Sequence, residues 1–236
     1  MSRQENALSF VLKAKKAAGD VGFTEDVLAS SFTARYSDSL LYTEASGRWY
    51  VWNGVYWEPD ATLRVENMVR CHLREVAKLG HQLREIDYKT TKGICRGSMV
   101  TTVKNLARTD PRHAAVTSQW DSDDWKLGTP DGTVDLKTGR FVKPAPTDYI
   151  TKTTKVAPGG SCPVWEGFLR TITRGDEELA AFLKRLCGYS LTGSTKEHKL
   201  PFLFGTGGNG KSTFLETVRE IMGDYAGSAA PHMLIS

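Results

Sequence analysis

The chain has 236 residues, of which 40% are hydrophobic and 25% charged, with a formal net charge of +4. This length can bury a sizeable core and predicts two domains, and no repeat or low-complexity tract is visible. The N-terminus lacks an apolar signal core and no uncharged apolar stretch could span a bilayer, so we expect a cytoplasmic protein with no membrane partner.

Two helices and a small antiparallel sheet are predicted for the first 60 residues. One helix covers residues 4–18, and the next begins after Thr24, a candidate N-cap. We expect strands at 40–43, 48–52 and 55–57, with Asn53-Gly54 as the second turn. The sheet is crowded with aromatic residues, namely Trp49, Tyr50, Trp52, Tyr56 and Trp57. We favour a role in the sheet's own core over stacking on single-stranded bases, because so small a sheet needs these rings for packing.

Residues 61–112 combine two predicted amphipathic helices with an excess of positive charge. One helix covers 63–86, with Leu83 among its inward residues, and the other begins near Ser98. The segment holds eleven Lys or Arg against five acids, so it carries +6 and leaves −2 for the rest of the chain. Such a block can meet a nucleic-acid backbone, with Arg70, Arg74 and Lys78 as candidate contacts. A solvated helical face is an equally open interpretation.

The middle of the chain predicts short strands, a linker and two more helices. Residues 125–140 have the pattern of two tight turns around short strands. Residues 144–162 are rich in Pro, Thr and Gly and are predicted to cross between domains. One helix should contain Trp165 to Ile172, and another should start near Asp176 and stop at Gly188.

The cysteines and histidines predict neither a metal site nor a disulfide framework. Cys71, Cys95, Cys162 and Cys187 are far apart and form no C-x-x-C pair, which favours reduced and mostly buried thiols. The five histidines are equally scattered.

Residues 205–213 read Gly-Thr-Gly-Gly-Asn-Gly-Lys-Ser-Thr, a complete G-x-x-x-x-G-K-[ST] pattern. Glycines allow positive φ and let backbone N–H groups approach phosphates closely. Lys211 is then placed to reach the β- and γ-phosphates as the catalytic residue, and the Ser212 hydroxyl to ligate Mg²⁺. The apolar run 200–204 predicts a strand before the loop, and 214–222 predicts a helix after it. The predicted ATP-binding residues are Gly205, Thr206, Gly207, Gly208, Asn209, Gly210, Lys211, Ser212 and Thr213; a ligand-free surface turn is the alternative.

Six segments together resemble the phage and plasmid primase-helicase family, which includes poxvirus-type proteins and belongs to the superfamily 3 helicases. They are Trp49–Asp60, Pro130–Gly139, Thr147–Lys152, Cys162–Phe168, Leu186–Gly193 and Gly205–Thr213. The ordered set is far more specific than any one segment.

The resemblance implies an α+β N-terminal and collar region followed by the start of an α/β, AAA+-like P-loop ATPase domain. The implied segments are 1–145, an N-terminal α+β region with basic helices; 146–195, a linker and helical collar; and 196–236, the first strand, loop and helix of the ATPase domain. It further implies a homo-oligomeric, hexameric ring around single-stranded or forked DNA. ATP and Mg²⁺ would bind at a subunit boundary, where the neighbouring subunit supplies an arginine finger. Primer synthesis is not expected, because the chain begins directly with the collar-like region.

These features favour the ATP-binding N-terminal portion of a DNA helicase that acts in DNA replication. The alternative is a non-catalytic DNA-binding or oligomerisation module with a vestigial loop, and a small-molecule P-loop kinase is a distant third. No second acidic motif follows the loop, so we expect this chain to bind ATP without turnover. We also expect the terminal strand-loop-helix to be either poorly ordered or docked against the collar.

Overall fold

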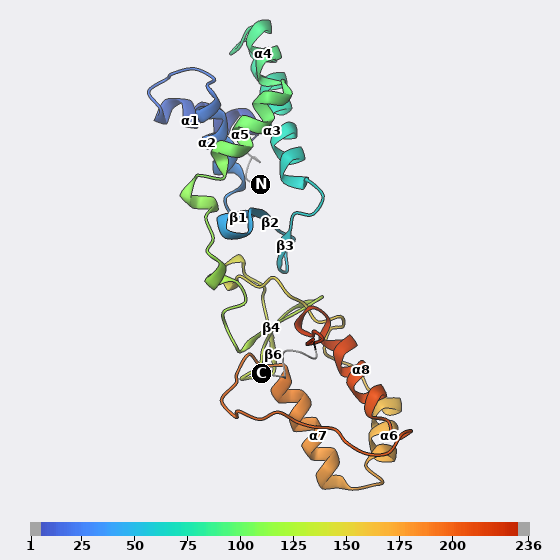
Figure 1. Cartoon of the computed structure of the whole chain (residues 1–236). Coiled ribbons are helices and arrows are strands. Elements are labelled where there is room, and N and C mark those ends of the chain that lie inside the picture. The colour runs from blue at the N-terminus through green and yellow to red at the C-terminus, as the bar shows by residue number, and fades with distance from the viewer. Residues whose placement is uncertain (1–5, 231–236) are drawn as a thin grey trace. The chain divides into compact units, whose positions relative to one another are not determined.

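The computed structural model describes residues 6–230, which divide into two compact units (Figure 1). The first unit contains the described residues up to 119 except 54–56, and the second contains 54–56 and 120–230. Both units combine helices with a three-stranded antiparallel sheet, which confirms the predicted α+β class for the N-terminal region. The three predicted segments divide the chain differently and stay a prediction.

The first unit is built from helices whose apolar faces share one core. The helices are α1 Ala7–Ala17, α2 Glu25–Tyr36, α3 Arg64–Gln82, α4 Tyr88–Ile94 and α5 Gly97–Ala107. The Thr24 hydroxyl accepts the Val27 N–H at 3.3 Å, so the predicted N-cap of α2 is confirmed. Phe32, Val69 and Val103 bring α2, α3 and α5 together in this core. The first two residues of the predicted 4–18 helix lie outside the described residues.

Helix α3 ends earlier than predicted. Leu83 lies outside the helix and is 64% exposed, so its predicted inward position is wrong. The chain turns at Arg84, which has a φ of 59°, and the amides of Glu85 and Ile86 both donate to the Gly80 carbonyl. Ile86 then packs against Gly80, where a Cβ would lie only 3.0 Å from its side chain. The missing side chain at Gly80 therefore lets Ile86 take the buried position.

The first sheet has the order β1-β2-β3, from β1 Leu40–Thr43, β2 Arg48–Trp52 and β3 Trp57–Pro59. Trp52 pairs with Trp57, so a four-residue loop replaces the predicted Asn53-Gly54 turn and β3 begins two residues later than expected. This register sets the two indole rings 5.5 Å apart and leaves Trp57 only 1% exposed. Trp49 is also buried, against Tyr42, so the predicted core role is confirmed for Trp49 and Trp57.

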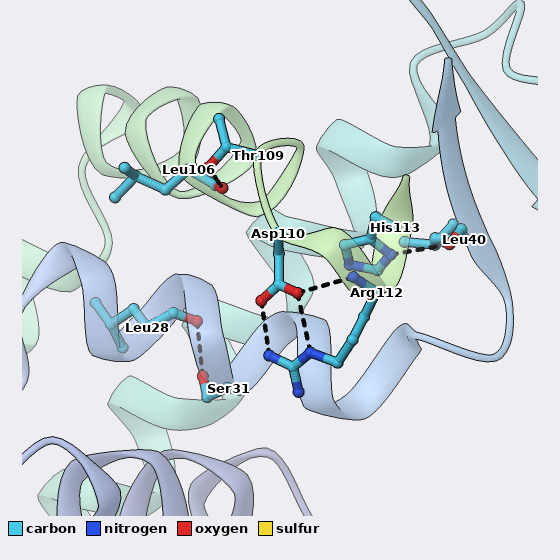
Figure 2. Close-up of polar contacts among 8 residues, drawn as sticks. All are labelled: Leu28, Ser31, Leu40, Leu106, Thr109, Asp110, Arg112 and His113. Atoms are coloured by element: carbon cyan, nitrogen blue, oxygen red, sulfur yellow. Dashed lines mark hydrogen bonds and ion pairs between the residues drawn. The ribbon is translucent and has the colours of Figure 1, made fainter. Parts of the chain in front are cut away.

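The end of the basic segment is tied to this sheet (Figure 2). Asp110 accepts the backbone N–H of Arg112 at 3.0 Å and pairs with its guanidinium at 2.7 Å. The next residue, His113, is buried, and its Nδ1 lies 2.8 Å from the Leu40 carbonyl of β1. The charge of Arg112, one of the eleven basic residues of the segment, is therefore balanced by Asp110. His113 anchors the chain on β1.

The second unit contains a small sheet and three helices. Its elements are β4 Lys126–Thr129, β5 Gly132–Asp135, β6 Arg140–Val142, α6 Pro163–Ile172, α7 Glu177–Ser190 and α8 Lys211–Met222. The two predicted tight turns join the three strands in the order β4-β5-β6, as expected. Asp176 caps α7 by accepting the Leu179 N–H at 3.0 Å, and the helix runs past its predicted stop at Gly188.

The predicted strand over 200–204 is not formed. The segment belongs to neither sheet of the described residues, so no neighbouring strand satisfies its backbone. Phe202 is 78% exposed and Phe204 is 92% exposed, whereas Leu203 packs against the cluster of Leu169, Leu183 and Phe214. The segment has the short apolar run of a buried strand, but a strand also needs a hydrogen-bonded partner.

The predicted burial of the thiols is wrong, because Cys71, Cys95 and Cys162 are exposed and Cys187 is half-buried. In the described part of the chain, all four are free cysteines. Over that same part, the search for a helix both long and apolar enough to cross a membrane finds none.

Candidate functional site

The backbone of the glycine-rich loop has the conformation that its glycines predict. Gly205, Gly208 and Gly210 have φ values of 144°, 72° and 81°. A Cβ on Gly205 would lie 2.6 Å from the Asn209 side-chain nitrogen, so a side chain there would displace Asn209 as well as strain the backbone. The loop is exposed along most of its length, which leaves its main chain open to a ligand.

The ammonium group of Lys211 lies against the loop that precedes it. Its Nζ donates to the carbonyls of Gly205 at 3.1 Å and Thr206 at 3.2 Å. A third bond, 2.6 Å long, reaches Oδ1 of Asn209. These acceptors come from both sides of the loop, so Lys211 concentrates one positive charge where the main chain curves.

The loop leads directly into α8, whose N-terminus has no side-chain cap. Phe214 makes the first helical hydrogen bond, to the Gly210 carbonyl at 2.9 Å, and the first turn holds no acid. The earlier amides, together with the positive end of the helix dipole, can therefore face an anion. Ser212 and Thr213 are exposed on this turn. Four other helices fill the equivalent place with a side chain, namely Asn6, Thr24, Asp87 and Asp176, whereas α3, α5 and α6 also lack one at this position.

Aromatic packing from α6 fixes the start of α8. The rings of Trp165 and Phe214 are stacked, with centroids 5.7 Å apart. Gly210 fits against the same helix so closely that a Cβ there would lie 2.5 Å from the Ile172 side chain. Helix α8 is therefore docked on α6, which lies in the segment predicted to be the collar; docking was the second of the two arrangements considered from the sequence. No local pattern assigned these contacts, because they join residues about 40 positions apart in the chain.

A cavity of about 450 Å³ opens beside Lys211. Its walls include Phe182, Phe202 and Phe204, and its polar lining residues are Thr173, Arg174, Asn209 and Lys211. Small-molecule sites commonly have this size and this mixture of apolar walls with few polar groups.

The second predicted set of residues lies in the first unit. Arg70, Arg74 and Lys78 are all exposed, and their four-residue spacing sets them on one side of α3 at intervals of about 6 Å. We call these three residues the α3 basic stripe. The acids of the same helix are engaged elsewhere: Glu66 with Lys104 at 2.6 Å and Glu75 with Arg35 at 2.7 Å.

Within residues 6–230, no acidic side chain forms an ion pair with the α3 basic stripe. Arg70 does donate to the neutral Asn67 side chain, at 2.6 Å. The three residues therefore lie on one exposed side of α3 without an ion-pair partner among the residues described, and their role as DNA contacts stays a prediction. This surface and the glycine-rich loop belong to different compact units.

Comparison with known proteins gives one result that bears on these sites. A family model described as D5 N terminal like matches residues 29–174, which is more than half of the chain. The match includes the α3 basic stripe and the β4–β6 sheet and ends before the glycine-rich loop. Among curated proteins, none matches the chain. The chain therefore belongs to the D5 N terminal like family, the N-terminal region of phage and viral primase-helicases.

Proposed function

We propose that this chain is the ATP-binding N-terminal portion of a superfamily 3-like DNA helicase that acts in DNA replication. The observation that carries the proposal is the Lys211 ammonium held inside a glycine loop that opens onto an uncapped helix N-terminus. Loop amides, helix dipole and lysine all favour a polyphosphate at the same place. Membership of a replication-protein family supports the same conclusion.

The residues present fit a nucleoside triphosphate with Mg²⁺. The backbone amides of Gly208, Gly210 and Lys211 would cradle the phosphates. The two glycines have no Cβ, so they can adopt positive φ and let the phosphates approach the main chain closely. Lys211 would exchange its bonds to the loop carbonyls for stronger, charge-assisted bonds to phosphate oxygens. The exposed Ser212 hydroxyl would ligate the metal ion, which supplies charge neutralisation between the β- and γ-phosphates.

In this proposal the α3 basic stripe contacts DNA. A single row of positive charges at helical spacing can follow the phosphates of one strand, and contacts to phosphates carry no sequence information. Binding should therefore tolerate any sequence. The full-length protein would form a hexameric ring on single-stranded or forked DNA, with an arginine finger supplied by the neighbouring subunit.

One observation favours the alternative of a non-catalytic DNA-binding or oligomerisation module. The segment before the loop pairs with no strand among the residues described, so the sheet of a motor domain is not assembled around the loop. In that case the α3 basic stripe would act alone and the loop would be vestigial.

Titration of the purified chain with ATP and Mg²⁺ separates the two candidates. We expect Lys211→Ala to weaken binding at least about tenfold, because it removes charged hydrogen bonds to the phosphates. Lys199→Ala is the matched control, since Lys199 is an exposed lysine of the same unit outside the loop. Equal affinities of the Lys211→Ala and Lys199→Ala variants would remove the loop as the nucleotide site.

A further inference from the structure

The turn that follows α8 is docked on a distant segment by main-chain hydrogen bonds. This turn is Gly223–Tyr225, and its partner is the stretch 151–155, about 70 residues earlier. The Asp224 amide donates to the Thr153 carbonyl at 3.0 Å, and its carboxylate accepts the Thr153 amide at 3.2 Å. The Lys155 amide donates to the Ile221 carbonyl at 3.0 Å. Both segments therefore donate and accept hydrogen bonds where the end of α8 meets residues 151–155. We call this contact the joint.

The Tyr225 hydroxyl extends this joint to the β4–β6 sheet. It accepts the Gly128 amide of β4 at 2.9 Å and donates to the Lys152 carbonyl at 3.1 Å. Burial raises the pKa of Tyr225 to about 12, so the phenol keeps the proton that it donates. One hydroxyl thus bridges a sheet strand and the segment on which α8 docks.

Two glycines show how closely the chain segments approach one another at this joint. A Cβ on Gly128 would lie 2.3 Å from the Lys152 carbonyl oxygen, and one on Gly223 would lie 2.7 Å from the Thr153 carbonyl oxygen. Neither position can take a side chain without moving backbone. The contact is a specific, close-packed feature of the fold.

Helix α8 connects this joint to the glycine-rich loop. Its 12 residues make a rod of about 18 Å with the loop at one end and the joint at the other. At the loop end, Gly210 packs against Ile172 and Phe214 against Trp165. A ligand that restrains the loop must therefore also restrain the rod and, through Tyr225, the β4 strand.

We propose that Tyr225 is a positioning residue that couples nucleotide occupancy of the glycine-rich loop to the β4–β6 sheet. The inference rests on the proposed function, because it requires that the loop bind nucleotide. It goes beyond that function in naming the contacts through which nucleotide binding would affect the β4–β6 sheet. This sheet lies within residues 29–174, the region matched by the family model.

Amide hydrogen exchange of the full chain, with and without ATP and Mg²⁺, tests the coupling. In the wild type we expect nucleotide to slow exchange in 126–135 and 151–155 by about fivefold or more, the usual scale of coupling between sites. Tyr225→Phe keeps the ring but removes the bridging hydroxyl, so the nucleotide-dependent slowing at these segments should disappear. Because coupling is reciprocal, the wild-type state in which these segments are open should bind nucleotide more weakly by the same factor. A purely structural defect would instead speed exchange equally with and without nucleotide.

Two further variants control the experiment. Tyr189→Phe also removes a tyrosine hydroxyl that accepts a backbone amide, that of Glu197 at 3.2 Å, and should leave the coupling intact. Asp224→Asn keeps an oxygen that can accept the Thr153 amide and should retain coupling, whereas Asp224→Ala should lose it. Two results would overturn the coupling without affecting the proposed nucleotide site. In one, the wild type binds nucleotide but amide exchange at 126–135 is not slowed; in the other, Tyr225→Phe keeps the nucleotide-dependent slowing of exchange. Failure of the wild type to bind nucleotide would remove both.

Discussion

The imidazole Nε2 of His72 lies 2.9 Å from the hydroxyl of Ser31, and both side chains are completely buried between α2 and α3. The edge of the His72 ring faces Phe32, with centroids 5.8 Å apart. Its Nδ1 is buried with no hydrogen-bond partner among the described residues. Burial, with a smaller effect from the Arg35 charge, lowers the pKa of His72 to about 4, against a weaker opposing effect of Glu75.

This histidine should make the protein less stable in mild acid. The unfolded chain binds a proton near the ordinary pKa of about 6.5, whereas the folded chain does so only near pH 4. Stability is therefore full above the unfolded pKa and is lost as the pH falls toward the folded pKa, by up to about 3 kcal/mol. Urea unfolding of the wild type at pH 7.5 and pH 5.0 should show a loss of about 2 kcal/mol from this group.

His72→Gln should flatten that pH dependence, because it removes the proton that only the unfolded chain can bind. The exposed His81 supplies the control: His81→Asn should follow the wild-type profile. The pKa of His113 is also lowered by burial, but His113 is unchanged in both variants, so their difference isolates His72. An unaltered slope in His72→Gln would show that His72 is not the group responsible.

Two glycines of the loop should differ in their response to the same substitution. Gly210→Ala forces a side chain onto a φ of 81° and into the Ile172 side chain, so we expect a loss of more than about 2 kcal/mol in the free energy of unfolding. Around Gly207 a Cβ meets nothing within 4 Å, so Gly207→Ala should leave thermal stability nearly unchanged. Differential scanning calorimetry of both variants compares the two. Equal melting temperatures would mean that α8 is not packed on α6 as described.

Sequence patterns predicted the features that depend on neighbouring residues. The cap at Thr24, the helix start near Asp176 and the turns between β4, β5 and β6 are stabilised within a few residues, so local chemistry is enough to define them. The glycines of the loop were predictable for the same reason, since positive φ is a property of single residues.

Features that depend on distant partners were not predictable in this way. Tyr225 bonds to Gly128, 97 residues away, and neither residue has a local signal for the contact. The apolar run 200–204 has a local preference for a strand, but the predicted strand is not formed, because a strand exists only where another chain segment pairs with it. The excess of positive charge in 61–112 made Arg70, Arg74 and Lys78 candidate DNA contacts, whereas the engagement of Glu66 and Glu75 elsewhere needed the fold.

The side chains of residues 200–204 differ in exposure, which leads to a further prediction about stability. Leu203 contacts the cluster around Leu183 and Phe214, so Leu203→Ala should lower the free energy of unfolding by about 1–2 kcal/mol, less than for a fully buried leucine. Phe204 is 92% exposed, so Phe204→Ala should change stability little and should reduce self-association at high protein concentration. Chemical denaturation and sedimentation measure the two effects. A larger loss for Phe204→Ala than for Leu203→Ala would contradict this packing.

Charge reversal of the α3 basic stripe should weaken binding to single-stranded DNA and reduce its salt dependence. Replacing Arg70, Arg74 and Lys78 together by Glu removes three phosphate contacts, so the slope of log affinity against log salt should fall by about 2. Arg112→Gln is the control, because the Arg112 guanidinium is paired with Asp110 and should contribute little. Fluorescence anisotropy with oligonucleotides of different sequence gives both the slope and the sequence tolerance. Unchanged slopes in the triple variant would assign the stripe to an ordinary solvated face.

The last prediction is that the 236-residue chain binds ATP without measurable turnover. Phosphoryl transfer needs an acidic group beside the phosphates to hold Mg²⁺ and orient water. Asp224, the acid that follows α8, is committed to Thr153 at the end of the helix opposite the loop, about 18 Å away. Phosphate release should therefore stay at background with and without single-stranded DNA, in the wild type and in Lys211→Ala alike. Turnover that disappears in Lys211→Ala would show that another acid of this chain reaches the nucleotide, and Asp224→Ala would then test whether the joint must open to supply it.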